Sequence, residues 1–367
     1  MVNSVEKKLS KDTRIIIVII VLIMVAVGYW QILLPWMSEK NYRNGFIANS
    51  QGQYLASISF LDKCIQLTPW ETYYFITQVR NYEELSRQEK DIDKQKQWLV
   101  KARDLYTYML NINPENPWYW NGIASIYLSL FNVSQTAEER KENFDLAGVA
   151  YKNAAEADQL NPLFQMSYGF YLHRSGETDE AIKLYQKCTE LDDWFVEAFY
   201  RLAEIELARG NYDKAIEHLE GIASADRVNY YEPGKSYGGW VKGGNFNNYR
   251  QKLAELYFSH KKDMAKSIEY YKWTLEMNDS DPLAWKGLGM AYHQDNQLER
   301  AIYCYKKSIS LNPDQEDVYK YLSYLYYNIG LVNSSKENFN RYFKSNNNDK
   351  KARDDYEKIN AFTGSIR

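Results

Sequence analysis

The stretch that decides the fold is residues 285–313, which read "WKGLGMAYHQDNQLERAIYCYKKSISLNP". Large apolar residues such as Trp285 and Tyr292 recur in it at the i, i+3, i+4, i+7 spacing of one helix face. A short polar segment divides the stretch, and a proline, which does not continue a helix, closes it. The pattern predicts two antiparallel helices, with the small residues Gly289 and Ala301 at the point where they cross closely.

This stretch resembles the tetratricopeptide repeat, a helix–turn–helix unit of about 34 residues. The signatures W-x2-L-G-x2-Y and A-x3-F and the closing proline are filled by Trp285, Leu288, Gly289, Tyr292, Ala301, Tyr305 and Pro313. One such pair does not bury its apolar face alone, so the resemblance implies further copies on both sides.

Copies are found by following the small residue of the second helix along the chain. This marker falls at Ser57, Ala102, Ala150, Ala181, Ala215, Ser267, Ala301 and Ser335. Three of the intervals between markers are 34 residues, and a large residue mostly follows each marker by four positions. The sequence therefore predicts an all-α protein with a superhelical solenoid of about eight repeats.

The three longest intervals between markers indicate insertions near residues 86–97, 131–143 and 227–247. The first two are charged and polar, which suits solvated turns or helix extensions. The expected organisation is a basic cytoplasmic tail at 1–14, a transmembrane signal-anchor helix at 15–36, the solenoid at 37–347 and a carboxyl-terminal capping helix and tail at 348–367.

The amino-terminal segment from Ile15 to Leu34 contains twenty residues without a charge. A helix of that length spans about 30 Å, the thickness of a bilayer's hydrocarbon. Pro35 is expected to end this helix. The alternative is a cleaved signal peptide, because Ala26 and Gly28 form a small-x-small pair, but the apolar run continues past them, which favours an uncut anchor.

The charges beside this segment predict its orientation. Four basic residues precede it, whereas two follow it closely: Lys7, Lys8, Lys11 and Arg14, then Lys40 and Arg43. The positive-inside rule then places the amino terminus in the cytoplasm and the repeats across the membrane. We expect a single-pass membrane protein.

Bulk charge and chemistry-bearing residues point away from nucleic acid and from catalysis. The net charge of −3 provides no electrostatic footprint for nucleic acid. The three cysteines lie far apart, without zinc spacing, and are expected to be buried. The four histidines form no H-E-x-x-H or i, i+4 pair. We therefore expect no catalytic residues, no metal and no cofactor.

A glycine-rich stretch, "EPGKSYGGWVKGGNFNNY" at residues 232–249, interrupts the repeats. It contains Gly-Lys-Ser, but a phosphate-binding loop also needs an earlier glycine, where Asn229 stands, and a preceding strand. We expect an insertion loop whose Tyr237, Trp240 and Phe246 contact either the groove or a partner.

The resemblance to tetratricopeptide solenoids also implies a ligand groove lined by the first helices. Carried onto this chain, its positions are Met166, Phe170, His173, Tyr200, Glu204, Lys286, Met290, His293, Lys320, Tyr324 and Tyr327. These side chains suit other proteins or peptides as ligands. Several of them could equally pack between repeats.

The expected function is a membrane-anchored scaffold or adaptor that binds partner proteins through this groove. The junction "LLPW" followed by "LTPWETYY", within residues 15–75, also resembles the repeat tail of bacterial O-antigen polymerase and ligase-type proteins. That resemblance implies a role in envelope or surface-polysaccharide assembly. The alternatives are an accessory subunit of a glycan polymerase or ligase system, or an enzyme with a site in the groove.

Overall fold

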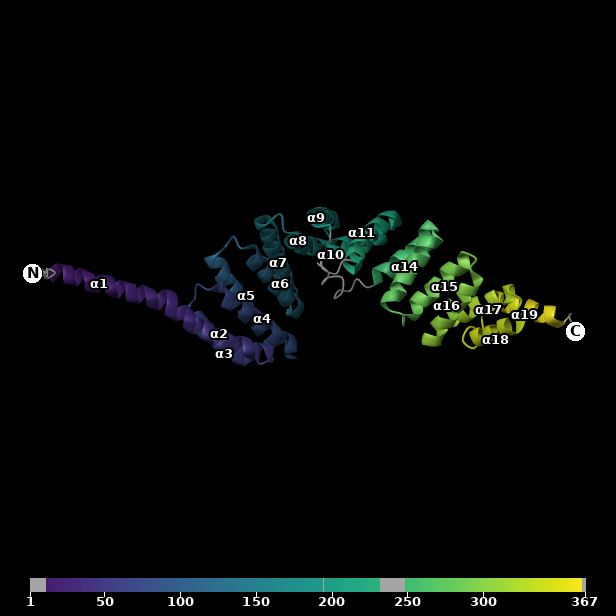
Figure 1. The fold of residues 1–367 in the computed structure, drawn as a ribbon, viewed down its shortest axis with the longest axis horizontal. Helices are drawn as coiled ribbons and strands as arrows, with labels where there is room; N and C mark the ends of the chain where they lie inside the picture. The colour runs from purple at the N-terminus through teal and green to yellow at the C-terminus, as the bar shows by residue number, and fades with distance from the viewer. Residues whose placement is uncertain (1–10, 194, 232–247, 365–367) are drawn as a thin grey trace, which may run out of the picture. The chain divides into compact units, whose positions relative to one another are not determined.

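The computed structural model describes residues 11–193, 195–231 and 248–364, and describes the backbone alone at residues 11–14, 225–231 and 362–364. Within these ranges every regular element is a helix (Figure 1), which confirms the all-α prediction.

The chain divides into two compact units, residues 1–187 and residues 188–367, which are described separately. The helices that begin in the first unit are α1 (Lys11–Gly28), η1 (Tyr29–Leu33), α2 (Leu34–Ser50), α3 (Tyr54–Leu67), α4 (Thr72–Gln88), α5 (Ile92–Ile112), α6 (Pro117–Val133), α7 (Ala137–Ala157), α8 (Pro162–Ser175) and α9 (Thr178–Leu191). Those of the second unit are α10 (Val196–Ala208), α11 (Tyr212–Tyr231), α13 (Tyr249–Leu256), η3 (Tyr257–Lys261), α14 (Met264–Met277), α15 (Pro282–Gln294), α16 (Leu298–Leu311), α17 (Glu316–Asn328), α18 (Val332–Phe343) and α19 (Lys350–Gly364).

The helices from α2 to α18 form eight antiparallel pairs within the described ranges, which confirms the predicted number of repeats. The pairs are α2 with α3, α4 with α5, α6 with α7, α8 with α9, α10 with α11, α13 with α14, α15 with α16, and α17 with α18. In each pair we call the earlier helix the first helix and the later one the second helix. The second helices α14, α16 and α18 begin 34 residues apart, at Met264, Leu298 and Val332.

The eight small marker residues are all buried, in agreement with their expected place at the helix crossing. They are Ser57, Ala102, Ala150, Ala181, Ala215, Ser267, Ala301 and Ser335. The large residue four positions later packs beside the crossing. In two pairs it is a fully buried tyrosine, Tyr185 in α9 and Tyr305 in α16.

Glycine is needed on the first helix opposite these two rings. A Cβ added at Gly289 would lie 2.8 Å from the ring of Tyr305, and one added at Gly169 would lie 2.7 Å from the ring of Tyr185. Atoms do not approach so closely without a shift of the helices. The hydrogen atom of glycine therefore sets how near the two helices of these two pairs can lie.

The two charged segments near 86–97 and 131–143 form mostly helix rather than long loops. Helices α5 and α7 each have 21 residues, and only three residues connect each of them to the helix before it. Asp91 caps α5 by accepting hydrogen bonds from two backbone N–H groups, and Thr136 caps α7 by accepting one from Glu139.

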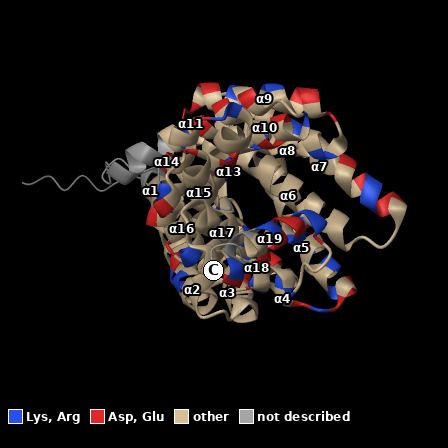
Figure 2. Ribbon diagram, turned by 90° about the vertical axis from the view of Figure 1, so that its right-hand side faces the viewer, with Lys and Arg blue, Asp and Glu red and all other residues tan. Residues whose placement is uncertain are grey.

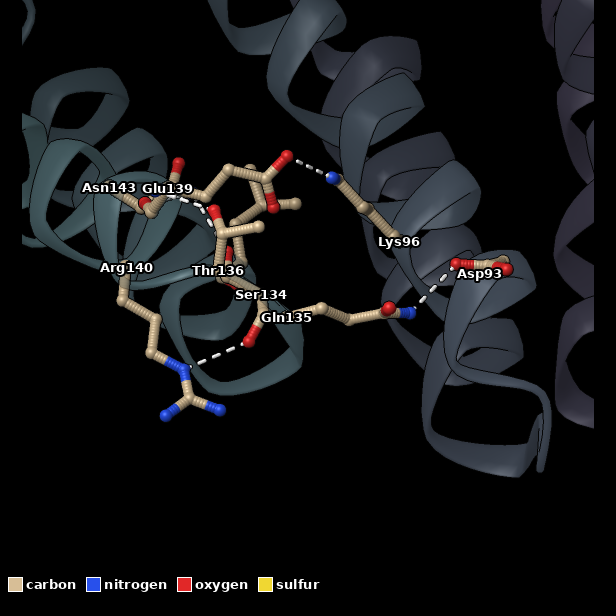
Figure 3. Close-up of polar contacts among 9 residues, drawn as sticks. Asp93, Lys96, Ser134, Gln135, Thr136, Glu139, Arg140 and Asn143 are labelled. Atoms are coloured by element: carbon tan, nitrogen blue, oxygen red, sulfur yellow. Dashed lines mark hydrogen bonds and ion pairs between the residues drawn. The ribbon is translucent and has the colours of Figure 1, made fainter.

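These helix extensions contact each other across neighbouring pairs (Figure 3). Lys96 of α5 forms an ion pair with Glu139 of α7 at 2.7 Å, and the amide of Gln135 donates to Asp93 at 3.1 Å. Arg140 Nε donates to the carbonyl of Ser134, which holds the turn before α7. The contacts tie the second and third pairs together at their polar turns.

Charge is distributed unevenly between first and second helices. Figure 2 shows α6 and α15 almost entirely tan, whereas α7 and α9 carry both colours. Helix α6 has no Asp, Glu, Lys or Arg, because it packs against α5, α7 and α8 and has little surface left for solvent. The first helices α6 and α15 therefore belong mainly to the interior of their units, whereas the second helices α7 and α9 carry solvated charge.

The helix at the amino terminus does not end at Pro35, so that expectation was wrong. The π-helical turn η1 connects α1 to α2, and Pro35 lies in the first turn of α2. A proline inside a helix leaves a backbone carbonyl without its usual donor, and a π turn is a known way to accommodate such a break. The helix from Ile15 to Ser50 is long and apolar enough to cross a membrane, and its most apolar window is wholly unburied.

The glycine-rich insertion falls largely outside the described residues. Helix α11 runs to Tyr231 and α13 begins at Tyr249. Tyr237, Trp240 and Phe246, which we predicted to contact a partner or the groove, lie in the range 232–247 that the structure does not describe.

We predict that Gly289→Ala destabilises the α15–α16 pair by about 1–3 kcal/mol, because the new methyl group overlaps the Tyr305 ring. In a Tyr305→Leu background the same change should cost little, since Ala has the higher helix propensity once the ring is gone. Hydrogen exchange of the α15 and α16 amides measures this local stability. Equal costs in both backgrounds would contradict the steric explanation.

Candidate functional site

The side chains that could bind a metal or take part in catalysis lie apart from one another. Among the residues that the structure describes, no group of three or more His, Cys, Asp or Glu side chains could hold a metal ion. His173 is exposed on α8, and His260 stacks on the ring of Tyr212. Burial lowers the pKa of both His218 and His293, which favours their neutral forms at pH 7.

The predicted groove residues fall on both units. Met166, Phe170 and His173 lie on α8 in the first unit, and the other eight lie on α10, α15 and α17 in the second: Tyr200, Glu204, Lys286, Met290, His293, Lys320, Tyr324 and Tyr327. Met166 is buried, while Phe170 and Tyr327 keep about two fifths of their surface exposed, at 38% and 40%.

The two predicted groove lysines form ion pairs with acidic residues further along the solenoid, in the next repeat for Lys286 and beside the capping helix for Lys320. Lys286 of α15 pairs with Asp317 of α17. One repeat later, Lys320 of α17 pairs with Asp349, the residue before α19, at 3.2 Å. The two lysines are 34 residues apart, so the same inter-repeat contact occurs twice along the solenoid.

Tyr324 contacts the capping helix in the same way. Its hydroxyl donates to Asp355 of α19 at 3.0 Å, and its ring packs edge-on against buried Phe339. Glu204 accepts a hydrogen bond from Arg201 on its own helix. Lys286, Lys320 and Tyr324 therefore act in the structure as contacts between repeats.

A different hollow lies between the second helices α14 and α16, over the face of α15. Its volume is about 580 Å³. We call it the α14–α16 groove, and it is lined by Lys272, Leu275, Glu276, Trp285, Leu288, Tyr292, Glu299, Arg300, Tyr303 and Cys304. Another hollow, of about 640 Å³, lies at the first helix pair, beside Trp36 and Tyr73.

The α14–α16 groove has an apolar floor and an aromatic wall. Leu288 and Cys304 are buried at its base. The rings of Trp285 and Tyr303 meet edge-to-face at 5.9 Å, and the indole N–H of Trp285 donates to the carbonyl of Asp279 at 2.7 Å. That hydrogen bond fixes the indole, so the wall is rigid, while Tyr303 remains 55% exposed.

Charges of both signs surround this floor. The guanidinium of Arg300 lies over the ring of Tyr292, 5.6 Å from its centre. Burial raises the pKa of the Cys304 thiol to about 12, although Lys272 acts in the opposite direction. At pH 7 the thiol is thus protonated and behaves as part of the apolar floor.

Sequence reasoning missed this groove, because it interpreted Trp285 only as packing between helices. The available signal was Tyr303, a tyrosine two residues after the buried marker Ala301. On an amphipathic second helix that offset points towards solvent, where a large aromatic residue is unusual unless it contacts something.

The eight helix pairs of the described residues, several of them spaced by 34 residues, define an α-helical repeat protein. Comparison with protein families agrees with this class: two models, each described as a tetratricopeptide repeat, match residues 172–232 and 282–315. The chain contains tetratricopeptide repeats within these residues. The predicted family is therefore confirmed.

Individual relatives match only in part. The chain is 38% identical over 67 residues to RANBP2-like and GRIP domain-containing protein 1 of Homo sapiens, which covers 18% of this chain and 4% of that protein. It is 27% identical over 156 residues to Superkiller protein 3 of Saccharomyces cerevisiae, which covers 42% of this chain and 10% of that protein. The matches thus span a tenth or less of these curated relatives.

Solved structures are similar in fold. The carboxyl-terminal part of a tetratricopeptide repeat-containing protein from Cytophaga hutchinsonii aligns with a TM-score of 0.50 at 15% identity, over 77% of this chain and 98% of that one. YrrB, described as a tetratricopeptide protein with an unusual peptide-binding site, aligns with a TM-score of 0.47 at 16% identity, over 57% of this chain and 99% of its own.

The contacts of Asp349 predict a pH-dependent cap. Hydrogen bonds from the N–H of Ala352 and the hydroxyl of Tyr342, together with the ammonium of Lys320, lower the pKa of Asp349 from 3.8 to about 2. A depressed carboxyl pKa stabilises the fold above the unfolded value, and this contribution is lost as the pH falls through the folded value. Docking of α19 should therefore weaken between about pH 4 and pH 2.

Asp349→Asn keeps an acceptor for the Ala352 N–H but removes the charge. We expect faster hydrogen exchange of the α19 amides at pH 7 and no further loosening of α19 between pH 4 and pH 2, after correction for intrinsic rates. Asp354→Asn is the matched control, because the Asp354 side chain is exposed on α19 itself. Equal effects of the two changes would contradict this role of Asp349.

Proposed function

We propose that this chain is a single-span membrane protein whose tetratricopeptide repeats bind a partner protein through the α14–α16 groove. The repeat fold is that of a protein-binding scaffold. Tetratricopeptide proteins are generally not enzymes, and we propose a non-catalytic role for this chain as well. The observation that carries the proposal is the aromatic groove, with Trp285 held rigidly beside an exposed Tyr303.

The dimensions and lining of the groove suggest what it binds. A hollow of about 580 Å³ with a leucine floor and aromatic walls suits one or two large apolar side chains of a polypeptide. Lys272 and Arg300 on one hand, and Glu276 and Glu299 on the other, provide partners for charges beside that anchor. The proposed ligand is therefore a peptide segment with an aliphatic or aromatic anchor between charged residues.

The span is proposed to anchor these repeats to a membrane with the amino terminus in the cytoplasm. Support comes from the apolar helix between Ile15 and Ser50 and from the exposed rings of Tyr29, Trp30 and Trp36 at or just past the far end of its uncharged stretch, residues 15–34. Tryptophan and tyrosine prefer the headgroup region of a bilayer. Anchoring raises the effective concentration of the groove near membrane-bound partners.

The process we propose is envelope or surface-polysaccharide assembly, either as an adaptor or as an accessory subunit of a glycan polymerase or ligase system. The proposal is supported by the junction between the span and the first repeats, which resembles the repeat tail of O-antigen polymerase and ligase-type proteins.

We predict that the full chain, tagged before Met1 and after Arg367, stays in the membrane pellet after alkaline extraction as a single band that carries both tags. Deleting residues 15–34 should release it, because these residues supply the apolar length that a bilayer holds. In intact cells or spheroplasts, protease should remove the tag after Arg367 and spare the tag before Met1. Loss of the amino-terminal tag during maturation would show a cleaved signal peptide instead.

We predict that a photo-crosslinking amino acid at Tyr303 captures a partner in native membranes at least fivefold more efficiently than the same amino acid at Tyr327. Both tyrosines are exposed, but only Tyr303 lines the α14–α16 groove. Mass spectrometry identifies the partner, and a glycan polymerase or ligase would support the proposed process. Capture at Tyr327 alone would favour the groove of the first helices and overturn the proposal for α14–α16.

A further inference from the structure

The two edges of the first unit differ sharply in composition. Because its helices alternate in direction, the turns that follow second helices lie on one edge, and the turns that follow first helices lie on the other. We call the edge with the turns that follow second helices the turn edge; its turns are residues 68–71, 113–116 and 158–161. We call the other the polar edge; its turns are residues 51–53, 89–91, 134–136 and 176–177.

The turn edge exposes large apolar side chains. Trp70 is 40% exposed, Trp118 is 55% exposed and Leu160 is 77% exposed. The turns of the polar edge contain only Gln, Gly, Glu, Lys, Asp, Ser and Thr. Beside the polar edge, apolar residues are exposed at helix starts, such as Leu55 at 63% and Ile92 at 49%, but the turns themselves contain none. On the turn edge, Trp70 and Leu160 stand in the turns and Trp118 closely follows one. Exposed apolar residues at successive turns mark a surface that another apolar phase or partner covers.

Contacts between neighbouring turns make this edge continuous with the apolar helix. The rings of Trp30 and Trp70 meet edge-to-face at 5.2 Å, so the first turn lies beside the end of the span. The hydroxyl of Tyr119 donates to Thr72 at 2.7 Å, which joins the second turn to the first. Trp118 then meets Phe164 of α8 edge-to-face at 4.9 Å, at the third turn.

The span enters the repeats on this same edge. Helix α2 continues from α1 through η1, and its amino-terminal end lies at the turn edge because α2 runs in the same direction as α4, α6 and α8. A bilayer around Ile15–Leu34 therefore lies on the side of the unit where Trp70, Trp118 and Leu160 are exposed.

We infer that the turn edge of residues 1–187 rests on the surface of the bilayer that holds the span, with Trp70, Trp118 and Leu160 inserted in the headgroup region. The inference rests on the membrane span proposed above. Its partner is the phospholipid interface, because tryptophan favours the headgroup region and a leucine beside it can be buried at the boundary with the acyl chains.

The contact is apolar rather than electrostatic. The turns of the turn edge contain Glu71, Glu115 and Asp158 and no Lys or Arg. Anionic lipid attracts basic segments, so it adds nothing to this edge. Contact with zwitterionic phosphatidylcholine should therefore be insensitive to salt.

The test uses the full chain reconstituted into phosphatidylcholine vesicles, with one fluorophore on a single introduced cysteine. The reporter is Leu160→Cys, the matched control is Lys90→Cys in a turn of the polar edge, and Val21→Cys reports insertion of the span. The natural cysteines are buried, and burial raises the pKa of Cys64 to about 11, so they should not react at pH 7. Lipids with spin labels near the headgroup quench fluorophores that touch the bilayer.

We expect the label at Leu160 to be quenched by spin-labelled lipid at least threefold more than the label at Lys90, equally at 0.15 M and 1 M salt. Quenching at Val21 with equal, weak quenching at Leu160 and Lys90 would overturn the inference but leave the span intact. If Leu160 is shielded from aqueous iodide but not quenched by lipid, a protein covers the edge and the inference is wrong. If Val21 is not quenched, the proposed span itself fails.

Discussion

A close crossing, in which a large side chain of the second helix covers a small residue of the first, sets the spacing of two of the helix pairs. In α15–α16 and α8–α9 the contact is a fully buried tyrosine ring, Tyr305 or Tyr185, against Gly289 or Gly169. Two helices packed so closely still leave one apolar face open, which only the next pair can cover. The cores accordingly run through several pairs, as the cluster from α10 to α17 does.

This dependence explains how much of the fold could be predicted from the sequence. Buried small residues and the rings beside them must recur at a fixed period, so the repeats were predictable from Ala301 outwards. Helices α5 and α7 were less so, because the polar residues near 86–97 and 131–143 suit a solvated turn and a solvated helix equally. Contacts such as Lys96 with Glu139, which join these extensions, depend on neighbours that a one-dimensional pattern does not specify.

For the candidate site, the sequence predicted that the repeats carry a protein-binding groove, but not the residues that line the α14–α16 groove. Residues on the first helices were correctly placed on those helices, but the pattern did not show that the Lys286 and Lys320 side chains would reach acids of the next element. The α14–α16 groove arises between elements from two repeats, so no single repeat contains it. Tyr303 was the only local signal, and its meaning depends on Trp285 standing opposite.

The helix that continues through Pro35 constrains the first unit more than a flexible linker would. Since α1, η1 and α2 follow one another without a loop, the direction of the span sets the direction of α2, and the packing of α3 and α4 on it follows. With the proposed membrane span, the edge on which α2 begins is the edge nearest the bilayer. Exposed Trp118 and Leu160 lie on this edge, where apolar surface facing water lowers solubility. Their presence on this edge is understandable if a membrane, rather than water, lies against it.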